Sequence, residues 1–131
     1  MILPTGATVA VVDGGKLVMF HNVGHEVVKL EAMPAPAVAS GGASAGHHTS
    51  SANPDHGARE EGDFAAGVAA MLNSQALSGK LGELVVIAAP RTLGELRKHW
   101  HKALQAKLIG EIAKDLTGQS PDHIAAAILA A

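Results

Sequence analysis

Residues 84–89 read Leu-Val-Val-Ile-Ala-Ala, an apolar run without a charged or polar side chain. A strand with one solvated face alternates polar and apolar residues, whereas a strand covered on both faces is apolar throughout. We therefore expect a central strand here. Because successive side chains of a strand point to opposite faces, Val86 and Ile87 should both be buried, one on each side of a sheet.

Helical periodicity flanks this strand on both sides. From 59 to 78 apolar residues recur at the i, i+3, i+4, i+7 spacing of a helix, and Gly79 suits its C-terminal cap. A second helix is expected over 92–104, where Thr92 and Glu95 have the spacing of a capping box. Its apolar stripe comprises Leu93, Leu96, Trp100, Ala103 and Leu104.

The segment 108–116 fits either a helix or a strand. We favour a strand, because the alternation of strands and helices needs one here to complete a right-handed crossover. Beyond it, Ser120 is expected to cap a last helix with Pro121 at its first position.

Three extended segments, 8–12, 16–23 and 26–32, precede the first helix. Asp13-Gly14 separates the first two and indicates a hairpin with a type I′ turn. The order is therefore three antiparallel strands in a meander followed by α-β-α-β-α. We expect an α/β domain with the ribonuclease-H-like arrangement, a mixed five-stranded sheet with helices packed on it.

Residues 33–58 differ from the rest of the chain. They hold Pro, Gly, Ser and Ala without periodicity, which predicts a long flexible loop within a single domain spanning 1–131. The loop contains candidate zinc ligands, namely His47, His48, Asp55 and His56. The alternative is a polar loop with solvated histidines, since adjacent histidines point in different directions and no fourth ligand is fixed nearby.

Composition narrows the functional classes. The chain has no Cys, which excludes disulfides and thiolate chemistry, and its net charge of −2 gives no overall attraction to nucleic acid or to anionic membranes. No apolar stretch approaches the ~20 residues of a membrane span, and the first residues do not read as a signal peptide. We expect a cytoplasmic protein with no membrane partner and no cofactor.

The segment 91–107 is locally basic, with five Lys or Arg residues against Glu95 alone. Lys and Arg at this density are typical of contacts with RNA phosphates or an acidic partner. The candidate anion-binding residues are Arg91, Thr92, Arg97, Lys98, His101 and Lys102. The alternative is a solvated helix face on which Glu95 pairs with Lys98 and His99.

No catalytic residues are expected. A nuclease of this fold needs clustered acids that hold two metal ions, yet the central strand ends in Ala88-Ala89-Pro90. Asp13, near the end of the first strand, is better explained by its turn. A nucleophile elbow of the Gly-x-Ser-x-Gly type is absent as well.

Several stretches of this sequence resemble the bacterial host-attachment protein family, named for a requirement in attachment to host cells. These stretches are residues 3–8, 12–14, 20–22, 84–98 and 112–117, with the strongest match over 84–98. The family is itself similar to the middle domain of archaeal and eukaryotic release factors. The resemblance implies the ribonuclease-H-like fold and supports a strand at 108–116.

Three functions follow as hypotheses. The first is a non-catalytic interaction domain of the host-attachment family, with an unknown protein partner. The second is an RNA- or ribosome-binding module like a release factor, and the third is a metal-dependent hydrolase using the histidine-containing loop. Peptide release is not expected, because Gly41-Gly42 is followed by Ala43 where release factors carry Gln. The sequence indicates no oligomeric state.

Overall fold

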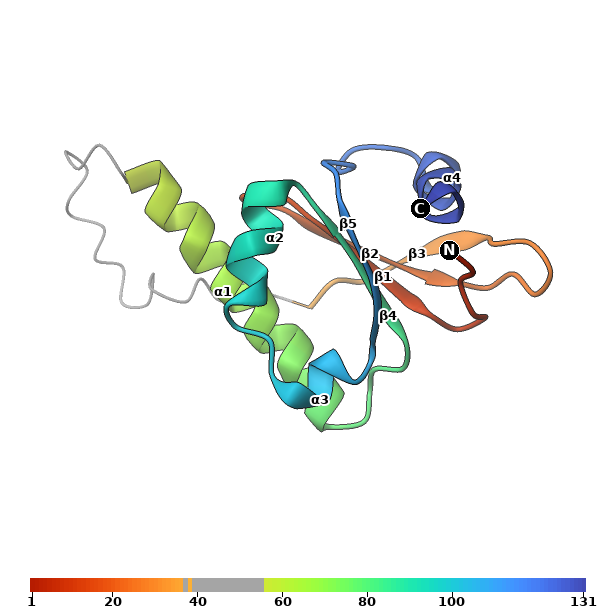
Figure 1. Cartoon of the computed structure of the whole chain (residues 1–131), viewed down its shortest axis with the longest axis horizontal. Helices are drawn as coiled ribbons and strands as arrows, with labels where there is room; N and C mark the ends of the chain where they lie inside the picture. The colour runs from red at the N-terminus through yellow and green to blue at the C-terminus, as the bar shows by residue number, and fades with distance from the viewer. Residues whose placement is uncertain (37, 39–55) are drawn as a thin grey trace.

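The structure, a computed structural model, describes residues 1–36, 38 and 56–131 (Figure 1). The described elements, in chain order, are β1 (Thr8–Val12), β2 (Leu17–Asn22), β3 (Leu30–Met33), α1 (His56–Leu77), β4 (Leu84–Ala88), α2 (Pro90–Arg97), α3 (Lys102–Gln105), β5 (Leu108–Ala113) and α4 (Pro121–Ala130). None of the helices in these residues is long and apolar enough to cross a membrane.

The strands form one mixed five-stranded sheet in the order β3-β2-β1-β4-β5. The β1-β2 and β2-β3 pairs are antiparallel, whereas β1-β4 and β4-β5 are parallel. The expected mixed α/β sheet is therefore confirmed, including the strand within 108–116. In the β4-β5 ladder, Leu84 pairs with Leu108 and Val85 with Gly110, so Ile109 is an extra residue on the edge strand.

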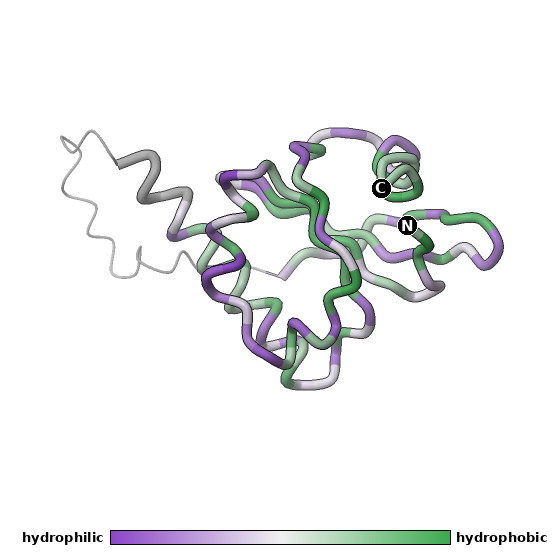
Figure 2. Tube along the Cα trace, viewed as in Figure 1, coloured by the Kyte–Doolittle hydropathy of each residue, from purple (hydrophilic) through white to green (hydrophobic). Residues whose placement is uncertain are grey.

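The central strands β1 and β4 are buried along their whole length. Val86 belongs to the apolar cluster under α1, α2 and α3, and Ile87 to the cluster under α4 and the N-terminal segment. The predicted burial of these two side chains on opposite faces is confirmed. Figure 2 shows the apolar character of these central strands, with α1, α2 and α3 on one side of them and α4 on the other.

The hairpin between β1 and β2 is closed by Asp13, and the predicted type I′ turn is wrong. Its carboxylate Oδ1 accepts the backbone N–H groups of Gly15 at 2.7 Å and Lys16 at 2.6 Å. A type I′ turn needs positive φ at both central residues. The glycines with positive φ in the described residues are Gly6, Gly79 and Gly118.

The strand β3 begins later than the predicted residue 26, because a buried side chain folds the chain before it. Asn22 is 2% exposed, and its Oδ1 accepts the N–H groups of Gly24 at 3.0 Å and Lys29 at 2.9 Å. Val23 also donates to the Lys29 carbonyl at 2.9 Å. These bonds hold residues 23–29 as a loop.

The helix predicted over 92–104 is two helices, α2 and α3. Asn73 of α1 holds the break between them: its Nδ2 donates to the His99 carbonyl at 2.8 Å, and its Oδ1 accepts the His101 N–H at 2.9 Å. The predicted capping box is also wrong. The cap of α2 is Ala89, with Pro90 as first residue and no side-chain cap bond, so Thr92 lies inside the helix.

Both other predicted helix ends are confirmed. Gly79 has φ 76° and donates to Ala76, while Lys80 donates to Gln75, which is the Schellman pattern. Ser120 caps α4, its hydroxyl accepting the His123 N–H at 3.1 Å.

The loop predicted over 33–58 is shorter at both ends. Met33 belongs to β3 and residues 56–58 to α1, and residues 37 and 39–55 lie outside the described part of the chain.

Candidate functional site

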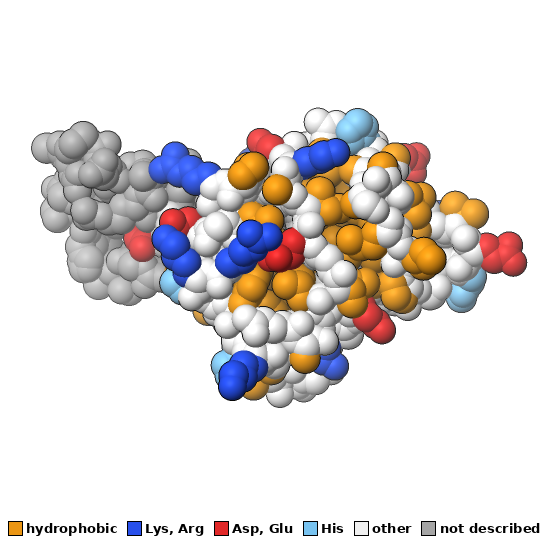
Figure 3. Space-filling view, viewed as in Figure 1, with side chains coloured by type: hydrophobic (Ala, Val, Ile, Leu, Met, Phe, Trp, Pro, Cys, Tyr) orange, Lys and Arg blue, Asp and Glu red, His pale blue; other side chains and the backbone are white. Residues whose placement is uncertain are grey.

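The predicted anion-binding residues lie on α2, on α3 and on the connection between them. Arg91 and Thr92 lie in the first turn of α2, Arg97 is its last residue, and His101 and Lys102 begin α3. We call the exposed surface of residues 91–107 the basic face. Figure 3 shows Lys and Arg side chains over the region of α2 and α3, with acidic side chains among them.

Arg97 and Lys98 of the basic face are paired with carboxylates. The Lys98 ammonium lies 2.9 Å from Glu95 Oε1, which confirms that part of the predicted solvated-face pairing. The hydrogen bond from Lys98 and its charge lower the pKa of the Glu95 carboxyl. Arg97 reaches across to Glu111 of β5, with its Nη2 3.1 Å from Glu111 Oε1. The face is therefore less positive than its Lys and Arg content suggests.

Glu111 is the residue that sequence reasoning missed. Each of its two carboxylate oxygens accepts a hydrogen bond from Arg97 Nε at 3.2 Å. The Trp100 indole N–H also donates to Oε2 at 3.4 Å. A charged residue inside the otherwise uncharged stretch 108–113 was the available signal, since such a residue needs a partner when it faces a neighbouring helix.

His101 has a structural role as the cap of α3. Its Nδ1 accepts the Ala103 N–H at 3.0 Å. An imidazole nitrogen that accepts a hydrogen bond carries no proton, so the capping form is the neutral ring. While His101 caps α3, its Nδ1 is used by the backbone and is not available to a ligand. Lys102 and Lys107 are exposed and make no ion pair within the described residues.

The carboxyl ends of β1, β4 and β5 meet at one edge of the sheet, where open α/β sheets bind ligands. Asp13 and Asp115 follow two of these strands. Asp115 Oδ1 accepts the Thr117 hydroxyl at 2.7 Å. Partial burial acts to raise the pKa of Asp13, but hydrogen bonds from Gly15, Lys16 and Thr117 and the charge of Lys16 outweigh it and lower the pKa.

Both acids thus hold turns at this edge of the sheet, and the Thr117 side chain hydrogen-bonds to both of them. Across the described residues, His, Asp and Glu form no group of three or more that could hold a metal ion. Of the predicted loop ligands, His47, His48 and Asp55 lie outside the described part, and His56 is described only as the first residue of α1.

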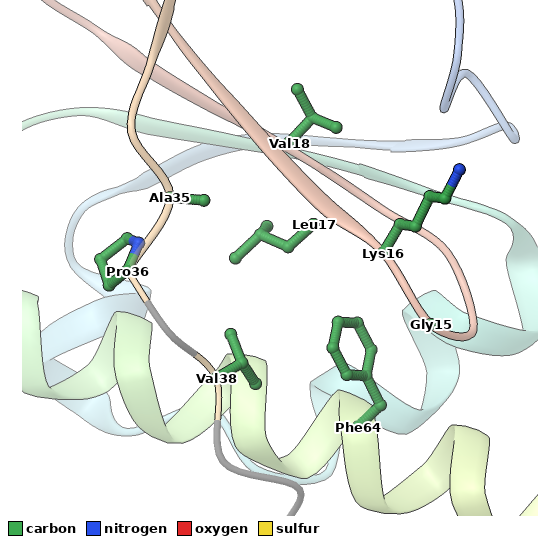
Figure 4. Close-up of a pocket in the computed structure, with 8 residues that line it drawn as sticks. All are labelled: Gly15, Lys16, Leu17, Val18, Ala35, Pro36, Val38 and Phe64. Atoms are coloured by element: carbon green, nitrogen blue, oxygen red, sulfur yellow. The ribbon is translucent and has the colours of Figure 1, made fainter.

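A pocket of ≈ 370 Å³ lies between the start of β2, the segment after β3 and α1 (Figure 4). Leu17, Val38 and Phe64 point toward one another across it, and the Lys16 ammonium points away from them. Its described lining carries no second charged side chain, so the pocket lacks the converging polar groups that orient a reacting substrate.

A second hollow, which we call the apolar cleft, lies on the opposite side of the sheet and has a volume of ≈ 320 Å³. Three of its lining residues are large and exposed: Ile2 at 90%, Val27 at 74% and Leu129 at 52%. His25 and Glu26 supply the only charged or titratable side chains of its described lining.

Comparison with known proteins connects this geometry to a family. A model described as bacterial archaeo-eukaryotic release factor family 12 matches residues 6–128, from the turn before β1 to within α4. No curated protein matches the chain. The match includes the whole sheet and the basic face, and it confirms the release-factor likeness expected from the sequence. The chain therefore belongs to the bacterial archaeo-eukaryotic release factor family 12.

Proposed function

We propose that this domain is a non-catalytic, release-factor-like module of the cytoplasm that binds RNA through its basic face. The observation that carries the proposal is the gathering of Arg97, Lys98, Lys102 and Lys107 on two short helices and the turn after them, at one side of the sheet. Membership of a release-factor-like family supports it, because release factors act on the ribosome, whose surface is rich in RNA.

A ribonuclease-H-like classification of the fold is part of this proposal. It is supported by the strand order β3-β2-β1-β4-β5, with three antiparallel strands followed by two parallel ones. In such a sheet α2 follows the carboxyl end of β4, the central strand. The basic face is thereby anchored on the most buried part of the molecule, which gives its cations a rigid support.

The two ion pairs do not remove Arg97 and Lys98 from binding. Their side chains are 57% and 65% exposed, so a ligand can reach both cations while the pairs are intact. An RNA phosphate that arrives with its own negative charge therefore meets cations that are held in place at little energetic cost. Release of counterions from the RNA supplies most of the driving force for such contacts.

The non-catalytic part of the proposal rests on the acids. Asp13 holds the β1-β2 turn and Asp115 bonds to Thr117, and among the described residues no group of three or more His, Asp or Glu could hold the metal ions of a two-metal reaction. The role in attachment to host cells that the sequence resemblance implies would then be an indirect result of binding RNA.

A second candidate function is protein binding at the apolar cleft. The exposure of Ile2, Val27 and Leu129 around one hollow favours it, because soluble proteins rarely leave large apolar side chains together in water without a partner.

Salt-dependent binding of a short labelled RNA hairpin tests the first function. The Arg97→Ala, Lys98→Ala, Lys102→Ala triple variant should bind more weakly, and the slope of log K against log salt should flatten by about 0.7–0.9 for each phosphate that the variant no longer neutralises. Lys29→Ala, which removes an exposed cation between β2 and β3, is the matched control and should keep the wild-type slope. An unchanged slope in the triple variant would show that the basic face is only solvated.

A further inference from the structure

Glu111 and Arg97 form the best-defined polar contact on the basic face. Arg97 meets the carboxylate side-on: its Nε donates to both oxygens at 3.2 Å, and its Nη2 lies 3.1 Å from Oε1 as an ion pair. The two partners differ in position, since the side chain of Arg97 is 57% exposed and that of Glu111 is 21% exposed. The carboxylate thus lies behind the guanidinium, on the side of the sheet.

The side-on contact leaves the outer edge of the guanidinium available for a ligand. A guanidinium has five N–H donors in a fixed plane, and the hydrogen bonds to Glu111 use only the donor of Nε, with Nη2 close by as the ion-pair contact. The Nη1–Nη2 edge keeps a donor on each nitrogen, in the fork geometry that binds two phosphate oxygens at once.

Trp100 fixes the carboxylate in turn. Its indole N–H lies 3.4 Å from Glu111 Oε2, and its ring packs against the apolar cluster beneath α2 and α3. The Arg97 guanidinium is therefore positioned by the Glu111 carboxylate, which the Trp100 indole positions in turn. Ordering of this kind lowers the entropy that Arg97 would lose on binding a ligand.

We propose that Glu111 is a positioning residue for phosphate recognition, which fixes Arg97 so that its outer N–H pair binds one RNA phosphate. This inference rests on the proposed function and deepens it. The opposite possibility is that Glu111 competes with phosphate for Arg97. The shielded position of Glu111 and the outer edge of Arg97 that it leaves open favour positioning over competition.

Substitution of Glu111 by Gln separates the two roles by the sign of its effect. Loss of a negative charge by itself strengthens attraction to a polyanion. Positioning predicts the reverse, a roughly two- to tenfold weaker affinity for the RNA hairpin, equivalent to one hydrogen bond. The matched control is Glu83→Gln, which removes an exposed carboxylate just before β4 and should bind RNA as well as wild type or slightly better.

A double-mutant cycle with Arg97→Lys links the effect to Arg97. Lys keeps the charge but cannot form the fork. Arg97→Lys should weaken binding on its own, and adding Glu111→Gln to it should cause little further loss of affinity. Because Glu111→Gln changes the hydrogen-bond partner of the Trp100 indole, an unchanged thermal midpoint of the free variant is the check that its fold is intact.

The outcomes distinguish this inference from the function on which it rests. RNA binding by wild type together with equal or tighter binding by Glu111→Gln overturns the positioning role and leaves the RNA-binding function standing. Absence of salt-dependent RNA binding by the wild-type protein overturns both.

Discussion

The two sides of the sheet have similar buried cores but different surfaces. Each face covers a tightly buried apolar cluster, one beneath α1, α2 and α3 and the other beneath α4 and the N-terminal segment. At the surface, the first face presents Lys and Arg side chains (Figure 3). On the second face Ile2, Val27 and Leu129 are exposed to solvent. Both sides of the sheet therefore contribute to stability, whereas the basic face lies on only one side.

The largest effect should come from the second cluster. Ile87 is fully buried, and Ile87→Ala should lower the free energy of unfolding by about 2–5 kcal/mol because it removes buried carbons and leaves a cavity. Val86→Ala removes fewer carbons from the first cluster and should cost less. Urea denaturation measures both. A decrease of less than about 1 kcal/mol for Ile87→Ala would contradict an equally dense core on the two faces.

A smaller effect is expected for the buried Asn22, which joins the N-terminal segment to the β2-β3 loop. Besides its bonds to Gly24 and Lys29, its Nδ2 donates to the carbonyls of Leu3 at 3.0 Å and Pro4 at 3.1 Å. Asn22→Ala leaves these backbone groups without hydrogen-bond partners and should lower the free energy of unfolding by about 1–3 kcal/mol in the same urea assay.

The control for Asn22 is the less buried Asn73 on the first face. It makes two bonds that water can replace, so Asn73→Ala should cost only about 0.5–1.5 kcal/mol. Equal decreases in the two variants would mean that burial does not distinguish the two asparagines.

The smallest effect concerns acid. The pKa of Asp13 is lower in the folded protein than its ordinary value of 3.8. A lowered folded-state pKa stabilises the protein above the unfolded-state pKa, and this stabilisation is lost as pH falls through the folded-state value. Asp13→Asn keeps the Oδ1 acceptor but no longer titrates, so its thermal midpoint should fall less than that of wild type between about pH 5 and pH 2. Parallel pH profiles of the two proteins would rule out this role.

The sequence predicts several parts of the fold that depend on local pattern, although the type I′ turn after Asp13 and the capping box at Thr92 are local predictions that the structure contradicts. The buried strand β4 and the caps Gly79 and Ser120 can be predicted from sequence, because burial and backbone geometry select the residue types at these positions. The break between α2 and α3 cannot be predicted from the local sequence, since it depends on Asn73, a residue on another helix. Tertiary contacts of this kind override local periodicity.

The candidate site shows the same limit. Segment 91–107 is recognisably basic in sequence, and the Glu95–Lys98 pair follows from helical spacing. Glu111 lies fourteen positions after Arg97, and only the pairing of β5 with β4 brings the two together. The late start of β3 likewise depends on the bonds of Asn22 across seven residues to Lys29.

Amide NMR spectra of the intact protein during titration with the RNA hairpin test the central claim most directly, because they report which face of the sheet the ligand contacts. The account predicts salt-sensitive shifts confined to residues 91–107 and to Glu111, with the amides around Ile2, Val27 and Leu129 unmoved. Shifts centred on the apolar cleft, or no shifts at low salt, would contradict it.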